Sequence, residues 1–124
     1  MLLDSNIIIY AGQPDHDFLR RFIATHAPAV SAISYVEVLG YHNLTAAERT
    51  RLEAFFAAAT VLPLSQEILT EAVRLRQQRK MTLGDSLIAA TCLILGLTLV
   101  TRNTRDFTWI TALSLLNPFE AESM

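Results

Sequence analysis

Residues 82–107 read TLGDSLIAATCLILGLTLVTRNTRDF, a stretch that joins a long apolar segment to a short one ending in polar residues. Its uncharged part is shorter than the ~18 to 20 apolar residues that a membrane-spanning helix needs, and Gly96 divides it. We therefore expect a buried helix over residues 82–96 and a buried strand over residues 97–101. This succession is the unit from which α/β proteins are built.

The rest of the chain repeats the alternation of helix and strand patterns. It predicts the α/β class, here a three-layer α/β/α sandwich with a mostly parallel central sheet. A chain of 124 residues fits one domain, so we assign all of it, residues 1–124, to a single domain. The other expected strands are residues 2–4, 29–34, 60–64 and 112–118, and the other expected helices are residues 6–12, 15–26, 34–43, 45–59 and 65–80.

The composition narrows the class of protein. Hydrophobic residues make up 52% of the chain, charged residues only 18%, and the mean hydropathy is +0.33, which indicates a self-association surface. A net charge of -2 argues against a protein that coats nucleic acid through long-range electrostatics. The chain has no basic segment of a secretory signal at its start and a single cysteine, so we expect a cytoplasmic protein.

Three acidic residues stand at or after the ends of expected strands, and a fourth opens an expected helix. Asp4 closes the first strand, and Glu37 follows the second. Asp85 opens the helix before the fourth strand, and Asp106 follows that strand. Parallel sheets bind ligands in the crevice outside the carboxyl ends of their strands. Asp4, Glu37 and Asp106 therefore point at the same rim, and Asp85 reaches it if its helix starts there. In that case we expect the four carboxylates to converge on one crevice.

Each acid, taken singly, also has a structural interpretation. Residues 34–37 (SYVE) and 82–85 (TLGD) both fit the capping box, in which an acid at the third helical position bonds back to the cap. Asp106, taken alone, is typical of an ordinary acidic residue in a surface loop. Asp4 is harder to explain in this way, because no Lys or Arg precedes Arg20 to pair with it, and burying an unpaired carboxylate is costly.

Taken together, the four acids favour a metal ion. Two carboxylates ~4 Å apart repel by roughly 4 kcal/mol at an effective dielectric constant near 20. A cluster is tolerable only with a cation or with raised pKa values. Hard oxygen ligands select Mg²⁺ or Mn²⁺, which use one or two carboxylates together with waters and substrate phosphates. The residues thus predict Mg²⁺-assisted phosphate chemistry.

Three segments also resemble one known family. Residues 2–11 (LLDSNIIIYA), 31–41 (SAISYVEVLGY) and above all 83–107 are similar to the PIN-domain ribonucleases, most closely to their small toxin members of the VapC type. The resemblance implies a PIN-like nuclease domain over residues 1–124 whose acidic crevice binds Mg²⁺ or Mn²⁺ and hydrolyses RNA. It also implies a small antitoxin as partner and a homodimer.

The resemblance assigns roles by position. Asp4, Glu37 and Asp85 match the acids of the family site, and the family's fourth acid stands either at Asn103 or at Asp106; we favour Asp106. Asp4 and Asp85 would hold the metal, while Glu37 and Asp106 would ligate a second ion or orient the attacking water. Further residues expected beside the acids are Ser5, Asn6, Thr101 and Asn103, and those expected to contact RNA phosphates are Arg79, Arg102 and Arg105.

Other reactive side chains are given structural roles. The three histidines lack ligand spacing, Cys92 lies inside an apolar segment, and Phe107 and Trp109 could stack on a base but are more often core residues at such a position. Two alternative functions remain open. One is a catalytically silent PIN-like domain that binds RNA or a partner. The other is an Asp-nucleophile phosphohydrolase. That class requires a second acidic residue two positions after the first, where this chain has Asn6.

Overall fold

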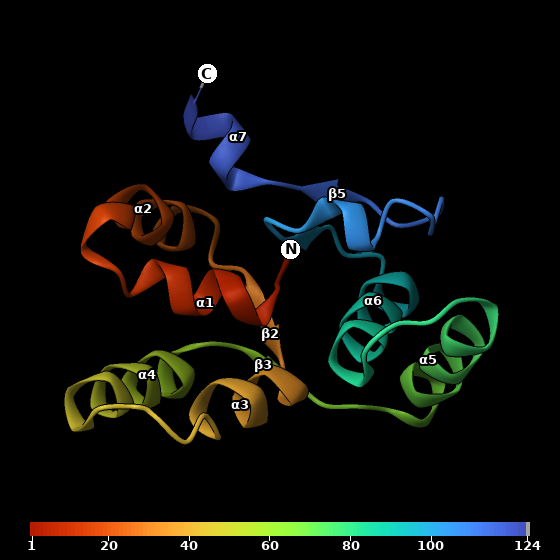
Figure 1. Ribbon diagram of the computed structural model, residues 1–124, viewed down its shortest axis with the longest axis horizontal. Coiled ribbons are helices and arrows are strands. Elements are labelled where there is room, and N and C mark those ends of the chain that lie inside the picture. The colour runs from red at the N-terminus through yellow and green to blue at the C-terminus, as the bar shows by residue number, and fades with distance from the viewer. Residues whose placement is uncertain (124) are drawn as a thin grey trace.

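The computed structural model describes residues 1–123, and its helices surround a central sheet (Figure 1). The strands are β1 (Leu2–Leu3), β2 (Ala29–Ser31), β3 (Val61–Leu62), β4 (Leu99–Val100) and β5 (Leu115–Leu116). The helices are α1 (Ser5–Ala11), α2 (Asp17–His26), α3 (Ala32–Leu39), α4 (Ala46–Ala58), α5 (Gln66–Gln78), α6 (Leu83–Leu95) and α7 (Pro118–Ser123), with short 3₁₀ helices at Pro14–His16 and Thr104–Asp106.

The sheet is parallel throughout, which confirms the α/β class. Its strand order is β3-β2-β1-β4-β5, and every neighbouring pair runs in the same direction. In the central pairs Leu3 lies opposite Val30 on one side and Val100 on the other. Because β1 and β4 are neighbours, the segments after Leu3 and after Val100 leave the sheet at the same edge.

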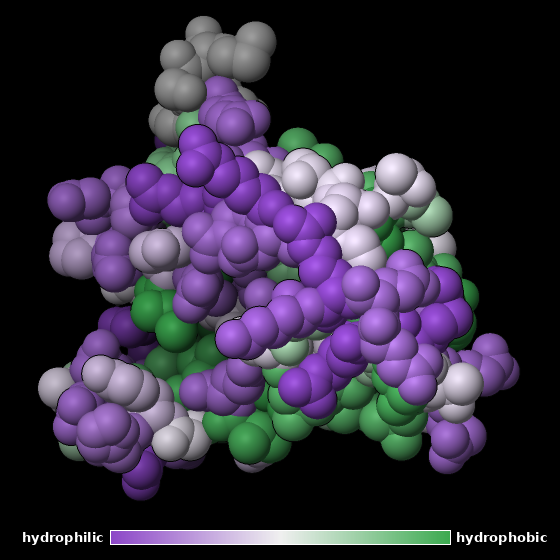
Figure 2. Space-filling view, turned by 45° about the vertical axis from the view of Figure 1, so that its right-hand side comes forward, coloured by the Kyte–Doolittle hydropathy of each residue, from purple (hydrophilic) through white to green (hydrophobic). Residues whose placement is uncertain are grey.

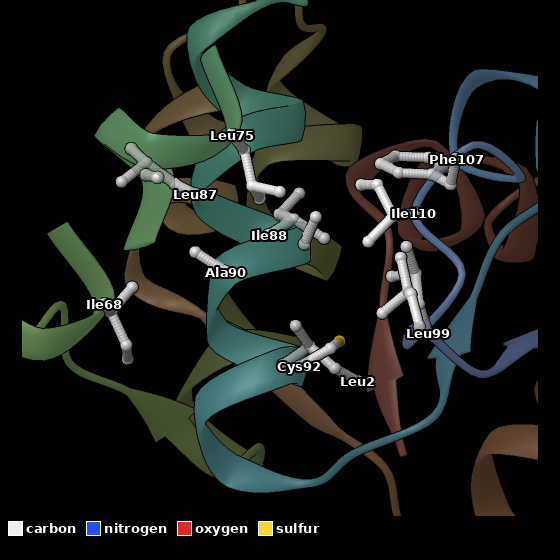
Figure 3. Close-up of a cluster of buried hydrophobic side chains, with 13 residues drawn as sticks. Leu2, Ile68, Leu75, Leu87, Ile88, Ala90, Cys92, Leu99, Phe107 and Ile110 are labelled. Carbon is white, nitrogen blue, oxygen red and sulfur yellow. The ribbon is translucent and has the colours of Figure 1, made fainter. Parts of the chain in front are cut away.

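Side chains of the strands alternate between two apolar layers, as the pleat of a strand requires. Leu2 and Leu99 are buried against α5 and α6, in a cluster with Ile88 and Phe107 (Figure 3). Residues one position further along, such as Leu3, lie in a second cluster with side chains of α1 to α4. Each fully buried leucine contributes about 1.5 to 3 kcal/mol. The expected three-layer sandwich is confirmed.

Helix α3 begins earlier than the sequence predicts. Strand β2 ends at Ser31, whose hydroxyl accepts a hydrogen bond from the Ile33 N–H at 3.1 Å and caps the helix. The expected strand over residues 29–34 is therefore too long, and Ser34 is an interior helix residue. The capping-box interpretation of residues 34–37 is wrong, because Ser31 already fills the capping position.

Helix α6 begins and ends close to its predicted limits. Thr82 caps it by accepting a hydrogen bond from the Asp85 N–H at 3.1 Å, and Gly96 ends it in the left-handed conformation at φ 66°. That φ favours glycine, which lacks the Cβ that would clash there. Among the described residues, no helix is both long and apolar enough to cross a membrane.

Candidate active site

Asp4 lies buried where β1 gives way to α1. Only 5% of the residue is exposed, and its Oδ2 accepts a hydrogen bond from the Thr101 hydroxyl at 2.8 Å. The Asn103 N–H in turn donates to Thr101 Oγ1 at 3.0 Å. Burial raises the pKa of Asp4 above its ordinary value, the hydrogen bonds from Thr101 and the Ser5 backbone oppose this, and the negative charges of Glu37 and Asp106 add to it.

Glu37 is an exposed residue of α3 whose carboxylate is held from two sides. The Ser5 hydroxyl donates a hydrogen bond to Glu37 Oε1 at 2.7 Å, and Ser5 Oγ also lies 2.8 Å from Ser34 Oγ. On the other side, the carboxylate rests against Gly84 of α6, where a Cβ would overlap Glu37 Oε2. Ser5 follows Asp4 directly, so one short segment carries a candidate ligand and a group that orients another.

Asp85 stands in the first turn of α6 and is partly buried. Its pKa is raised to about 6, first by burial and then by the charges of Asp4 and Asp106. The Thr82 hydroxyl opposes this increase, and Glu37 makes the smallest contribution to it. The carboxylate thus shares an electrostatic environment with acids from three other segments of the chain.

Asp106 is exposed at the end of the 3₁₀ helix that follows β4. Its charge raises the pKa of both Asp4 and Asp85, so the predicted convergence of acids extends to this position. Asn103 is linked to Asp4 indirectly, because its backbone N–H donates a hydrogen bond to Thr101. Asn6 is an exposed residue of α1. Within the described part of the chain, none of the four acids forms an ion pair with a lysine or arginine.

The acids interact without forming a closed metal cage. Over residues 1–123, no three His, Cys, Asp or Glu side chains are grouped so that they could hold an ion by themselves. An open arrangement of carboxylates suits Mg²⁺ or Mn²⁺ better than Zn²⁺, because Mg²⁺ takes one or two carboxylates and fills its other positions with water and phosphate oxygens. The donor set and its uncompensated negative charge therefore fit a hard divalent cation.

A basic rim adjoins the acids. Arg79 and Arg105 line a cavity of about 470 Å³ together with Asp85 and Asp106. Hydrophilic side chains extend across the middle of the molecular face shown in Figure 2. Arg102 does not line that cavity. Its guanidinium carbon lies 4.1 Å from the ring centre of Phe119 and 5.3 Å from that of Tyr10.

A model of the PIN domain family matches residues 1–110 of the chain. The chain belongs to the PIN domain family. A comparison with curated proteins finds no match.

Solved structures of similar shape agree with this assignment. A chain of a toxin-antitoxin complex from Klebsiella pneumoniae is 30% identical to this PIN domain, with a TM-score of 0.72 over 94% of this chain and 96% of that one. VapBC2 from Rickettsia felis, bound to a promoter DNA fragment, gives 23% identity and a TM-score of 0.81 over 94% and 96% of the two chains. VapBC-1 from nontypeable Haemophilus influenzae gives 24% and 0.78 over 95% and 97%. These two show the same fold.

Several residues near the acids of this PIN domain have contacts that the sequence did not predict. Ser34 contacts Ser5 from inside α3, whereas its sequence position suggested a helix cap. Gly84 leaves room for the carboxylate of Glu37, and a glycine at the start of a helix gives no signal of such a contact by itself.

Trp109 lines the cavity beside the acids, while Phe107 is a core residue with 1% exposure. Cys92 is also buried, which raises its thiol pKa to about 12.

Proposed function

We propose that this chain, as a single PIN-like domain over residues 1–124, is an endoribonuclease toxin of a toxin-antitoxin pair that depends on Mg²⁺ or Mn²⁺. The observation that carries the proposal is the group of four interacting carboxylates, Asp4, Glu37, Asp85 and Asp106, which form no ion pair within the described residues. Two of them, Asp85 and Asp106, line a cavity with a basic rim. Membership of the PIN family and the likeness to a chain of a toxin-antitoxin complex support it.

Asp4 and Asp85 are the proposed holders of the metal ion. Their raised pKa values record the cost of keeping a buried carboxylate, Asp4, and a partly buried one, Asp85, charged near other acids, and a divalent cation would remove that cost. When bound, the ion makes a coordinated water more acidic and offsets the charge of the phosphate. Asp85, with a pKa of about 6, is mostly ionised at neutral pH and available as a ligand.

Glu37 and Asp106 are the proposed ligands of a second ion or acceptors for the attacking water. Glu37 suits this role because Ser5 and Gly84 hold its carboxylate in one place, and a fixed acceptor orients a nucleophile better than a mobile one. Arg79 and Arg105 are exposed on the adjoining cavity and would bind flanking phosphates. Arg102 is a weaker candidate for this contact because it does not line this cavity, and its guanidinium packs on Phe119 and Tyr10 instead.

The proposed protein partner is a small antitoxin. A second cavity of about 280 Å³ lies between α1, α2 and α4 and is almost wholly apolar, with Ile8, Ile23 and Phe55 in its lining. A hollow of this kind fits an apolar segment of a partner chain. Because a chain of similar structure comes from a toxin-antitoxin complex, we assign the hollow to the antitoxin. A small protein encoded beside this chain should co-purify with it, and Phe55→Glu should abolish the association.

A homodimer completes the proposal. Large hydrophobic side chains are exposed on α3, at Tyr35 and Val36, and on α5, at Leu69 and Val73. Figure 2 shows hydrophobic surface along the lower part of the face in view. Exposed apolar side chains in such number, on a chain with 52% hydrophobic residues, favour self-association.

Cleavage of RNA tests the catalytic part of the proposal. Purified protein is incubated with total cellular RNA in Mg²⁺ or Mn²⁺, and the new RNA ends are sequenced; parallel samples contain EDTA or the Asp85→Asn variant. Discrete cuts that disappear in both controls are expected. RNA that binds the protein but stays intact would instead support the catalytically silent PIN-like domain.

A further inference from the structure

We propose that Trp109 and its surrounding cavity form a subsite that stacks one unpaired nucleobase of single-stranded RNA next to the cleavage site. The inference rests on the proposed function, since it names how that same site holds its substrate. It goes further because it assigns base recognition to one side chain, Trp109. From its position in the sequence alone, this residue would be expected in the core.

The cavity combines the three chemical features that a nucleotide requires. Trp109 and Met81 supply apolar surface, Arg79, Lys80 and Arg105 supply positive charge, and the proposed metal-binding acids Asp85 and Asp106 line the same space. At about 470 Å³ the cavity has the size of a small-ligand site. A nucleotide placed here would lay its base on the apolar surface while its phosphates reach the cations.

Trp109 is held in a fixed position and is partly exposed. Its indole N–H donates a hydrogen bond to the Asp106 backbone carbonyl at 3.2 Å, which fixes the ring relative to the loop that carries Asp106. The ring is partly exposed and packs against the buried cluster of Leu99 and Phe107. The Arg79 guanidinium carbon lies 5.6 Å from the ring centre, in a cation–π contact.

Arg79 can give up its place on the ring. Its side chain is exposed, and within the described residues it forms no ion pair. Stacking of a base on an aromatic side chain is stronger than an exposed cation–π contact. When a base takes the ring face, the guanidinium is free to pair with a neighbouring phosphate.

The subsite would favour unpaired RNA over a duplex. A base inside a duplex has both faces covered by its neighbours, whereas a base in a loop or single strand offers a free face. Selectivity for single strands would then come from Trp109, and phosphate attraction from the cations would be independent of sequence.

Binding of a defined oligonucleotide tests the subsite. Trp109 is the single tryptophan of the chain, so quenching of protein fluorescence reports directly on its ring. The probe is hexaadenylate RNA in buffer with EDTA, which keeps the strand intact. A fluorescein-labelled copy gives affinities for the variants by anisotropy, and a hexamer of abasic ribose phosphates measures the contribution of phosphates alone.

Hexaadenylate should quench Trp109, and Trp109→Leu should weaken its binding about 5-fold or more. Trp109→Phe should retain most of the affinity, because a phenyl ring still stacks, and the abasic hexamer should bind wild type and Trp109→Leu equally. Arg79→Gln should weaken both probes, while Arg49→Gln, at an exposed arginine of α4 outside this cavity, should change neither. Loss of affinity for the abasic hexamer in Trp109→Leu would indicate a merely structural tryptophan and overturn the subsite.

Cleavage of total RNA separates the two levels of the proposal. If wild type and Trp109→Leu cut the same RNA sites at equal rates, and hexaadenylate binds both equally, the subsite is overturned while the nuclease stands. If wild type neither cuts RNA nor binds hexaadenylate, the proposed function and the subsite both fail.

Discussion

At the scale of single residues, Asp4 shows how the fold maintains a charged group in its interior. The Thr101 hydroxyl reaches it from 97 positions away in the sequence, and the backbone N–H of Asn103 orients that hydroxyl. This support stabilises the carboxylate but does not cancel the cost of burial, since the pKa of Asp4 remains raised. Asp4 is thus better suited to binding a cation than to stabilising the fold.

Removal of the Asp85 charge should stabilise the metal-free protein at neutral pH. The folded-state pKa of Asp85 is about 6, above its ordinary value of 3.8, so the native state binds the proton more tightly than the unfolded state. Wild type therefore loses stability as pH rises from about 4 through about 6. Asp85→Asn should raise the free energy of unfolding by on the order of 1 kcal/mol at pH 7.5, after allowance for solvent screening.

Chemical denaturation at several pH values checks this expectation. The difference between Asp85→Asn and wild type should be largest above pH 7 and should shrink below pH 5. An unfolding free energy for the variant that lies below wild type at pH 7.5 would show that Asp85 is a structural residue.

Gly84 should matter to activity more than to stability. A Cβ at this position would displace the Glu37 carboxylate and break its hydrogen bond from Ser5, but the end of this exposed side chain can shift into solvent without moving the backbone. Gly84→Ala should therefore leave stability unchanged or raise it by up to about 1 kcal/mol, while RNA cleavage should fall about 10-fold or more because Glu37 is misplaced.

Gly12→Ala is the matched control for this substitution. A Cβ there would displace the guanidinium of Arg51, also the end of a flexible side chain, at a position that does not line the acidic cavity. Cleavage by Gly12→Ala should equal that of wild type. If Gly84→Ala cleaves RNA as fast as wild type at a temperature where both proteins are folded, the assigned position of Glu37 is contradicted.

At the scale of elements, helix starts decide where the acids stand. Local signals predicted the start of α6 at Thr82, since a capping threonine and an acid three residues later lie next to each other in sequence. The start of α3 was missed because Ser31 and Ser34 are both acceptable caps, and only the end of β2 at the sheet edge selects Ser31. The packing of β2 in the sheet therefore determines which serine caps α3, and sequence periodicity cannot predict this.

The cap of α6 should contribute to both stability and activity. Thr82→Ala removes the hydrogen bond to the Asp85 N–H and should lower the free energy of unfolding by about 1 kcal/mol. Fraying of this first turn should also slow RNA cleavage, because Asp85 lies in it. Thr45→Ala removes the corresponding cap of α4, which accepts from the Glu48 N–H at 3.1 Å.

The two caps form a matched pair for denaturation and cleavage assays. Both variants should lose similar stability, while only Thr82→Ala should lose activity at temperatures where both remain folded. Equal rates of RNA cleavage by the two variants would show that the first turn of α6 does not need to be fixed for catalysis.

At the scale of the whole molecule, the parallel sheet explains why distant acids meet. Alternating patterns in the sequence were sufficient to predict the α/β class. Because β1 and β4 are neighbours in the sheet, the residues that follow these two strands lie close together. The hydrogen bond between Asp4 and Thr101 and the cavity around Trp109 depend on side-chain packing across segments far apart in the chain. Such contacts have no local pattern, so they could be found only in the structure.

The chain should form a dimer through its exposed apolar side chains. Light scattering at tens of micromolar should report twice the 13.8 kDa chain mass, and Val36→Glu together with Val73→Glu should shift the protein to a monomer, because both side chains are more than half exposed. Their exposure in the free chain predicts little effect on folding itself. A wild-type monomer at this concentration would contradict the proposed self-association.

The claim that the four carboxylates bind divalent cations is tested most directly by thermal denaturation at pH 7.5 during a Mn²⁺ titration. The melting temperature of wild type should rise by several degrees at millimolar Mn²⁺. Asp4→Asn should largely abolish that rise, and Asp15→Asn, which removes one exposed charge outside the site, should preserve it. A melting temperature that does not respond to Mn²⁺, or that responds equally in wild type and Asp4→Asn, would contradict the claim.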